Sequence, residues 1–240
     1  KGCKAECPSN VDMAKLKYEF LHHYQQVHGV SLRSRLFGRI GALSRWGSWL
    51  APLVNRVNGN LAHRWIMDRF LGIDRRRPLP SFARNNFEAW WNRHEPTGTG
   101  ARGSVILFHD TFNTYNTPEV AVAATHLLEH FNYRVLTVPR RCCGRPMISK
   151  GMLKDAKEHA TWNVNKLLPY VEQGVPVVGL EPSCILTLRD EYPDLLRNEA
   201  ARVVAGQTFL IEEFLMRENA TRSLKNGSRP PVVLHGHCHQ

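Results

Sequence analysis

The stretch Ser104-Val-Ile-Leu-Phe-His-Asp110 decides the fold of this 240-residue chain. Its four consecutive apolar residues predict a buried strand that ends at a pair of polar side chains. Three more strand-like segments follow along the chain, at 134–138, 175–180 and 231–235. Helical segments lie between them, at 118–131, 151–173 and 192–218. Apolar strands that alternate with helices indicate an α/β fold, with a mainly parallel sheet flanked by helices.

Chemically reactive side chains follow the end of every predicted strand. In strand order they are His109 with Asp110, Cys142 with Cys143, then Cys184, then Cys238. Open parallel sheets bind their ligands beyond the carboxyl ends of the strands, and neighbouring strands lie only about 4.8 Å apart. We therefore predict one shared site, in which the sulfurs of Cys143 and Cys184 face the same pocket.

The first hundred residues show a different pattern from the rest of the chain. A loop with two cysteines is followed by a helical pattern over 11–27, which Gly29 ends. Apolar residues at three- and four-residue steps predict two or three short amphipathic helices between 31 and 72. A linker with a short helix at 87–91 follows. The predicted organisation is an all-helical part followed by the α/β part, in segments 1–29, 30–102 and 103–240.

The positive charge of the chain is concentrated in one segment. The whole chain carries a net charge of +11, and residues 30–78 contain ten Arg and two Asp, a net +8. This basic segment is either a solvated charged face or a docking surface for an acidic partner or an anionic membrane, to which each Arg contributes about 1 kcal/mol. Nucleic acid is not expected as a partner, because no recognition motif accompanies the charge.

The six cysteines occur in tight clusters, a usage typical of metal binding or redox chemistry rather than of a secreted disulfide framework. We expect a cytoplasmic protein, and no apolar run is long enough to predict a transmembrane helix. The chain begins at Lys1 inside a cysteine motif and breaks off at Gln240 just after a strand-like run. Both ends are therefore expected to be cut from a longer polypeptide.

Two cysteine motifs carry the predicted chemistry. Cys3-x3-Cys7-Pro8 is similar to the end of the bacterial ferredoxin motif C-x2-C-x2-C-x3-C-P. With the upstream ligands missing, this piece alone is not expected to hold a cluster. In the second motif, Cys142 and Cys143 are followed by Gly144, which lets a loop turn tightly and offer two thiolates to one metal group. The alternative is a pair of buried, unligated cysteines that act as small apolar residues.

The chain resembles the CCG domain, on the Cys142-Cys143-Gly144 motif and the later Pro182-Ser183-Cys184. CCG domains occur in heterodisulfide reductase B subunits and in the iron–sulfur subunits of glycolate oxidase, lactate-utilisation and anaerobic glycerol-3-phosphate dehydrogenase systems. His237-Cys238-His239-Gln240 resembles the opening of a second such motif. The amino-acid sequence over 179–191 and 108–112 is similar to that of fused bacterial proteins, which join an FAD-linked oxidase domain, a ferredoxin module and a CCG domain. The resemblance implies that this chain is a C-terminal fragment of such a fusion.

The resemblance implies metal ligands at Cys3, Cys7, Cys142, Cys143, Cys184 and Cys238. Two positions depart from the family pattern. Asp110 stands 32 residues before Cys142, where the family has a cysteine, and Thr187 replaces the second cysteine of the Cys-x2-Cys with which the pattern ends. We expect Asp110 to ligate iron through oxygen, or the site to hold a simpler cluster completed from elsewhere.

The implied function is electron transfer in a D-2-hydroxyacid dehydrogenase that acts on D-lactate, D-2-hydroxyglutarate or glycolate. FAD in an upstream domain of the same polypeptide takes the hydride, and electrons pass through 4Fe-4S clusters to a quinone or another carrier. This chain would carry no catalytic residue and would be inactive alone, in the cytoplasm or peripheral at the inner face of the membrane. The alternative is a cluster-free docking domain, which holds zinc if His235, His237 and His239 act with Cys238.

Overall fold

The computed structural model describes residues 7–9, 11–220 and 233. Its core is a four-stranded, all-parallel sheet in the order β2-β1-β3-β4. The strands are β1 (Ser104–Phe108), β2 (Arg134–Leu136), β3 (Val177–Gly179) and β4 (Thr208–Leu210). Ile106 of β1 is in register with Leu136 on one side and with Val177 on the other. The predicted α/β class, with an all-helical N-terminal part, is confirmed.

The fourth strand is not where the sequence predicted it. Residues 192–218 were expected to be helical throughout, but β4 lies between α14 (Glu199–Gly206) and α15 (Ile211–Arg217). The three residues of β4 are buried and pair with β3. Three residues are too few to show the two-residue period of a strand, so the pairing with β3, and not the local sequence pattern, determines that this segment is a strand. The strand predicted at 231–235 falls, apart from the exposed Val233, outside the described residues.

Alternate residues of the central strand pack into two different cores, as the two-residue period of a strand requires. Ile106 and Phe108 pack with residues of α11 (Leu153–Val171) and α14. Val105 and Leu107 pack with residues of α9 (Pro118–His130) and α15. Both faces of the sheet are therefore covered by helices, and the edge beyond the carboxyl ends of the strands is left for shorter elements.

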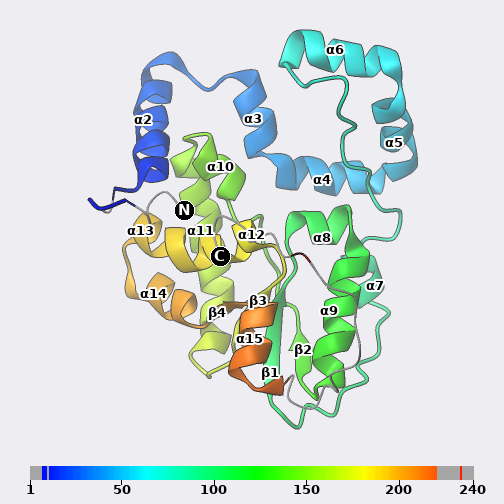
Figure 1. Cartoon of the computed structure of the whole chain (residues 1–240), viewed down its shortest axis with the longest axis vertical. Helices are drawn as coiled ribbons and strands as arrows, with labels where there is room; N and C mark the ends of the chain where they lie inside the picture. Colours follow the sequence, from blue (N-terminus) through cyan, green and yellow to red (C-terminus); the bar gives the residue numbers. More distant parts are fainter. Residues whose placement is uncertain (1–6, 10, 221–232, 234–240) are drawn as a thin grey trace.

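Of the six helices that precede β1 in the described part of the chain, five lie beyond that edge of the sheet (Figure 1). They are α2 (Met13–His28), α3 (Leu32–Gly38), α4 (Ile40–Trp49), α5 (Ala51–Gly59) and α6 (Leu61–Leu71). Residues 31–72 thus form four helices where two or three were predicted. The side chains of Ser31 and Asn60 accept hydrogen bonds from backbone N–H groups at the starts of α3 and α6. These caps begin separate helices, which the spacing of the apolar residues alone did not predict.

Helix α2 is attached to the α/β part by polar contacts along its length. Lys15 Nζ lies 2.8 Å from Asp194 Oδ2, and Gln25 Nε2 donates to the Lys150 carbonyl at 2.6 Å. Gly151 has a φ of +74°, and a Cβ there would lie 2.8 Å from the backbone nitrogen of His22. Only glycine allows both this backbone conformation and this close approach of α2.

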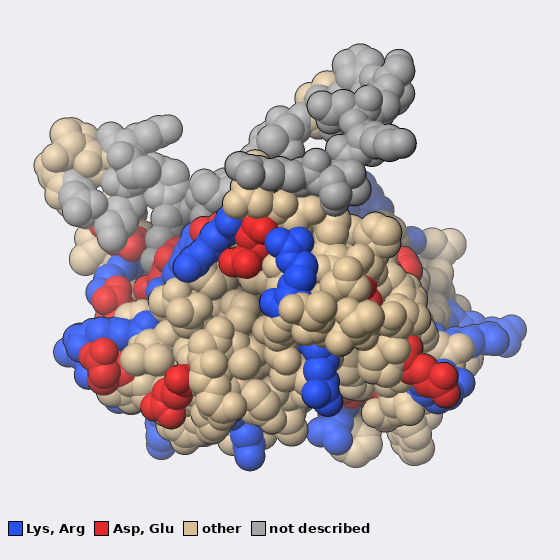
Figure 2. Space-filling view, turned by 90° about the horizontal axis from the view of Figure 1, so that it is seen from below, with Lys and Arg blue, Asp and Glu red and all other residues tan. Residues whose placement is uncertain are grey.

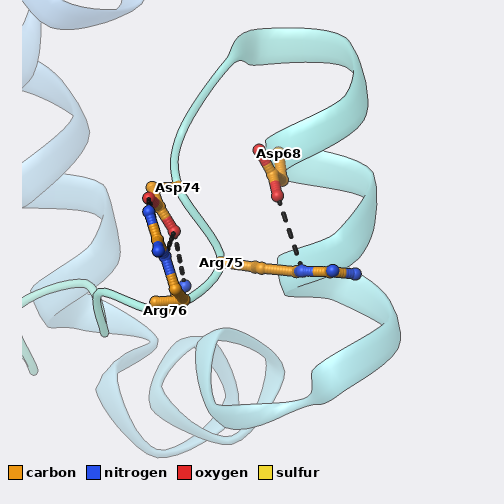
Figure 3. A network of polar contacts seen from close by, with 4 residues as sticks. All are labelled: Asp68, Asp74, Arg75 and Arg76. Carbon is orange, nitrogen blue, oxygen red and sulfur yellow. Dashed lines mark hydrogen bonds and ion pairs between the residues drawn. The ribbon is translucent and has the colours of Figure 1, made fainter.

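The two acidic residues of the basic segment are engaged by neighbouring arginines just after α6 (Figure 3). Arg75 Nε lies 3.7 Å from Asp68 Oδ2, and Arg76 Nη2 lies 2.6 Å from Asp74 Oδ2. Hydrogen bonds from Arg76 lower the pKa of Asp74 to about 2. Large apolar side chains are also exposed on the helices of the basic segment, among them Trp46 of α4. The segment therefore presents arginines together with uncovered apolar groups.

Among the described residues on the face seen in Figure 2, no comparable concentration of charge is present. In Figure 2, Lys and Arg side chains are scattered among Asp and Glu and separated by uncharged residues. None of the helices between residues 7 and 220 combines the length and the hydropathy that a membrane crossing requires.

Candidate functional site

The site lies where the strand order changes direction. From β1 the chain crosses to β2 on one side and later to β3 on the other, so the segments after β1 and β3 meet at the switch point, where open parallel sheets bind their ligands. Asp110 follows β1 and begins α8 (Thr111–Tyr115), and Cys184 follows β3 within α12 (Pro182–Leu186). Cys142 and Cys143 come from the loop between β2 and α10 (Arg145–Ser149).

The structure brings three of the predicted cysteines together. The Cys143 thiol lies close enough to those of Cys142 and Cys184 for the thiols to shift one another's pKa, and all three side chains are buried and outside any disulfide. The three sulfurs do not all lie within 4.8 Å of one another. Two thiolates on a tetrahedral zinc are about 3.8 Å apart, so this spread is wider than a single metal ion needs.

The thiols are neutral in this arrangement. The hydrogen bond with Cys143 and burial raise the pKa of Cys142 well above its usual range. The hydrogen bond with Cys142 lowers the pKa of Cys143, but the bond with Cys184 and burial outweigh it and leave that pKa well raised. The hydrogen bond with Cys143 also lowers the pKa of Cys184, and burial with the nearby Asp110 outweighs it. A metal that binds here must therefore displace protons from all three sulfurs.

Two buried side chains clamp the backbone of the Cys142–Cys143 loop. Asn163 of α11 accepts from the Arg141 N–H at 2.8 Å and donates to the Arg141 carbonyl at 3.2 Å and to the Tyr192 hydroxyl at 3.0 Å. Tyr192 in turn donates to the Cys143 carbonyl at 3.0 Å. Neither residue stands in a recognisable motif, and sequence reasoning missed both.

A second tie joins this loop to the segment after Cys184. Gly144 has a φ of +84°, which turns the chain directly after the cysteine pair. Arg145 Nη1 then lies 2.6 Å from Oε1 of the buried Glu191. Glu191 ends η1 (Thr187–Glu191), a π-helical turn, and such turns occur frequently at functional sites. The two cysteine-bearing segments are thus held to each other by an ion pair.

Asp110 lies at the site, and its carboxylate has a local structural role there. Oδ1 accepts from the N–H groups of Phe112 at 2.8 Å and Asn113 at 3.1 Å, and Oδ2 accepts from Asn113 Nδ2 at 2.5 Å. Asp110 is therefore the N-cap of α8. Burial, which these hydrogen bonds only partly offset, raises its pKa. The carboxylate is near enough to Cys184 to raise the pKa of that thiol.

Thr187, the other departure from the family pattern, is fully buried one turn after Cys184. Its hydroxyl donates to the Ser183 carbonyl at 2.7 Å. At the end of β1, His109 Nδ1 accepts a hydrogen bond from Arg140 Nε at 3.1 Å. Burial and the Arg140 charge lower the pKa of His109 well below its usual value, so this imidazole is neutral.

Helix α4 of the basic segment covers Cys142. A Cβ on Gly41 would lie 2.7 Å from the Cys142 Cβ and 3.5 Å from its Sγ, so the helix approaches the thiol at van der Waals distance. Beside this contact a pocket opens to the surface, and its lining includes Arg45, Arg140, Arg141, Cys142 and His159. Arginines from two parts of the chain thus line the approach to the cysteine cluster; Arg140 and Arg141 are neighbours of the cysteines in the sequence, whereas the place of Arg45 beside them was not predicted.

The remaining predicted ligands are not part of this cluster as described. Cys7 is half-buried in the loop before α2. Cys3 and Cys238 lie outside the described residues, as do His235, His237 and His239 of the zinc alternative. Their roles stay predictions.

Comparison with known proteins finds relatives among dehydrogenases. The chain is 29% identical over 214 residues to a subunit of the anaerobic glycerol-3-phosphate dehydrogenase of Escherichia coli, a match that covers 87% of this chain and 54% of that protein. It is 27% identical over 224 residues to D-2-hydroxyglutarate dehydrogenase of Pseudomonas putida, covering 88% and 22% of the two chains. Lactate utilization protein A of Geobacillus thermodenitrificans is 29% identical over 128 residues, covering 50% and 51%.

The chain therefore spans about half the length of the glycerol-3-phosphate dehydrogenase subunit and less than a quarter of the D-2-hydroxyglutarate dehydrogenase. No family model and no solved structure matches it. These similarities relate the chain to oxidoreductase subunits and to part of larger dehydrogenases.

Proposed function

We propose that this chain is the iron–sulfur electron-transfer part of a flavin-dependent D-2-hydroxyacid dehydrogenase. The observation that carries the proposal is the buried chain of thiols, in which Cys143 contacts both Cys142 and Cys184 at the switch point of the sheet. Cysteine thiolates are the usual protein ligands of iron–sulfur clusters, and three cysteines converge here from two separate segments, a loop and helix α12.

The donor set fits a cluster better than a single metal ion. Sulfur ligands favour iron–sulfur clusters, zinc or copper(I), and the spread of the three sulfurs exceeds what one tetrahedral ion needs. Cys142, Cys143 and Cys184 would hold the group, with Asp110 or Cys238 as the candidate for a further ligand. When bound, a cluster of this kind accepts and releases single electrons.

The residues around the thiols support that role in three ways. Asn163 and Tyr192 fix the backbone of the cysteine pair, as partners of metal ligands commonly do. Helix α4 packs closely against Cys142 at Gly41. The arginines beside the pocket offset the negative charge of bound thiolates, and they present a positive surface to an approaching partner.

The substrate class and the partners come from the relatives. Their names include D-2-hydroxyglutarate, glycerol-3-phosphate and lactate, and each of these is oxidised at a carbon that bears a hydroxyl group. We assign the oxidation itself to an FAD domain in the same polypeptide, and the electrons then leave through this chain to a quinone or another carrier. The chain alone has no dehydrogenase activity in this account.

Anaerobic reconstitution with iron and sulfide tests the proposal. The chain should take up iron and acid-labile sulfide together, and Cys143→Ser should lose both because Cys143 links the other two thiols. Cys7→Ser is the matched control, since it removes a thiol from the loop before α2 and should leave this iron in place. Equal iron in Cys143→Ser and in the unchanged chain would remove the basis of the proposal.

The second candidate is a cluster-free docking domain of the same protein. The observation in its favour is that both Asp110 oxygens are engaged at the start of α8, while Thr187 fills the other ligand position. In that case the reconstituted chain would bind no sulfide, and any zinc bound would be independent of Cys143.

A further inference from the structure

A second group of ligand-type side chains lies away from the cysteines, between the segment after α7 (Phe87–Trp91) and helix α9. It consists of His94, His126 and Glu129, with one possible ligand atom from each residue within 4.8 Å of the others. His94 Nε2 lies 2.8 Å from Glu129 Oε1, and His126 Nδ1 lies 3.8 Å from Glu129 Oε2. Within residues 7–220, this is the one such group of three.

The geometry points to a binding site for a divalent transition-metal ion such as Zn²⁺ at His94, His126 and Glu129. Two ligands bound at about 2.1 Å to a tetrahedral ion are about 3.4 Å apart. The two nitrogen–oxygen separations, 2.8 Å and 3.8 Å, lie on either side of this value. Imidazole and carboxylate together suit zinc and similar ions, and two His with one Glu are sufficient protein ligands.

The burial of the three side chains fits a metal site that is open on one side. The side chains of His94 and Glu129 are 7% and 1% exposed, whereas that of His126 is 53% exposed. The carboxylate is therefore held away from water, where a positive charge stabilises it. The exposed side at His126 leaves room for a solvent molecule as the fourth ligand.

The surroundings hold the three ligands in place. Thr97 Oγ1 donates to Glu129 Oε2 at 3.0 Å, which orients the carboxylate. Trp90 stacks on His94 with ring centroids 4.4 Å apart and meets His126 edge-on at 5.4 Å. His126 and Glu129 are three residues apart on α9 and so share one face of that helix.

A simpler arrangement explains only part of this group. A protonated His94 paired with Glu129 would neutralise the buried carboxylate without a metal. That pair gives no role to His126, whose Nδ1 lies beyond hydrogen-bond length from Glu129. A bound ion accounts for all three side chains, and it would fasten the segment after α7 to the α/β part.

Zinc titration of the full chain against a chromophoric chelator tests this site. The variants are His126→Ala, which removes an exposed ligand, and Glu129→Gln, which removes the charge. His130→Ala is the control, because His130 is also exposed on α9 but lies outside the group. All four proteins retain the same cysteines, so zinc bound there contributes equally to each.

The unchanged chain and His130→Ala should bind one more equivalent of Zn²⁺ than His126→Ala and Glu129→Gln. Loss of a ligand should lower the affinity for this Zn²⁺ ion by at least 10- to 100-fold, the effect typical of losing a residue that only supports a ligand. Zinc should also raise the midpoint of thermal unfolding in the first two proteins and less in His126→Ala. Equal zinc affinity and stoichiometry in His126→Ala and His130→Ala would overturn the assignment and leave a His94–Glu129 ion pair.

Discussion

The hydroxyl of Tyr192 donates a hydrogen bond to the backbone carbonyl of Cys143 at 3.0 Å, from a ring that is fully buried. The same hydroxyl accepts from Asn163 Nδ2 at 3.0 Å, and Asn163 also holds the Arg141 backbone. The cysteine pair is therefore fixed through its main chain, while its sulfurs are left to contact one another and a metal group.

Tyr192→Phe should loosen this loop without removing a sulfur. The change leaves the Cys143 carbonyl without this donor, which costs about 1–3 kcal/mol of unfolding free energy in a buried position. Release of iron from the reconstituted chain to a chelator should be faster, by roughly 10- to 100-fold. Tyr170→Phe, at a more exposed position of α11, is the control and should match the unchanged chain. Identical iron release in both variants would show that the hydrogen bond does not position the loop.

Gly41→Ala should disturb the contact between α4 and the cysteine cluster. The added Cβ would lie 2.7 Å from the Cys142 Cβ, so α4 must shift, at a cost of about 1–3 kcal/mol. Alkylation of Cys142 in the metal-free chain should become faster. Gly206→Ala in α14 is the control, because a Cβ there meets no atom within 4 Å and should be neutral or stabilising. Unchanged stability and alkylation in Gly41→Ala would mean that the packing of α4 does not limit access to Cys142.

Asp110→Cys should increase iron retention while lowering stability. The new thiol stands beside Cys184, but the variant loses the cap of α8, which costs about 1 kcal/mol. Asp110→Asn preserves a capping side chain and adds no thiol, so it should leave iron retention no higher than in the unchanged chain. Urea unfolding and iron analysis of both variants separate the two effects. No gain of iron in Asp110→Cys would exclude this position as a ligand.

The basic segment is predicted to bind an anionic surface through arginines and exposed apolar side chains such as Trp46 and Trp49. Co-sedimentation with liposomes should require anionic lipid and should weaken as salt is added, because exposed charges are screened within about 8 Å at physiological ionic strength. Neutral liposomes are the control. Binding that is equal on neutral lipid at high salt, or absent on anionic lipid, would indicate an ordinary solvated face.

The sequence predicted that three cysteines converge, but it missed several of the elements and contacts around them. The convergence of Cys142, Cys143 and Cys184 follows from a topological rule that needs only the order of strands and helices. The strand β4 was missed because three residues cannot show a period. Asn163 and Tyr192 were missed because each acts through contacts far away in the sequence.

Two further features required three-dimensional information. Gly41 is an ordinary glycine in a helical pattern, and only its distance to Cys142 gives it a role. The group of His94, His126 and Glu129 left a weak trace, since a His and a Glu three residues apart share a helix face. The third ligand, His94, comes from the segment after α7, and sequence spacing alone does not show that this segment lies beside α9.

The most direct test of the central claim is low-temperature electron paramagnetic resonance of the anaerobically reconstituted chain after reduction with dithionite. We predict the signal of a reduced iron–sulfur cluster, retained in Cys7→Ser and lost in Cys143→Ser. A chain that gives no such signal after reconstitution, or a signal that Cys143→Ser leaves unchanged, would contradict an iron–sulfur site at Cys142, Cys143 and Cys184.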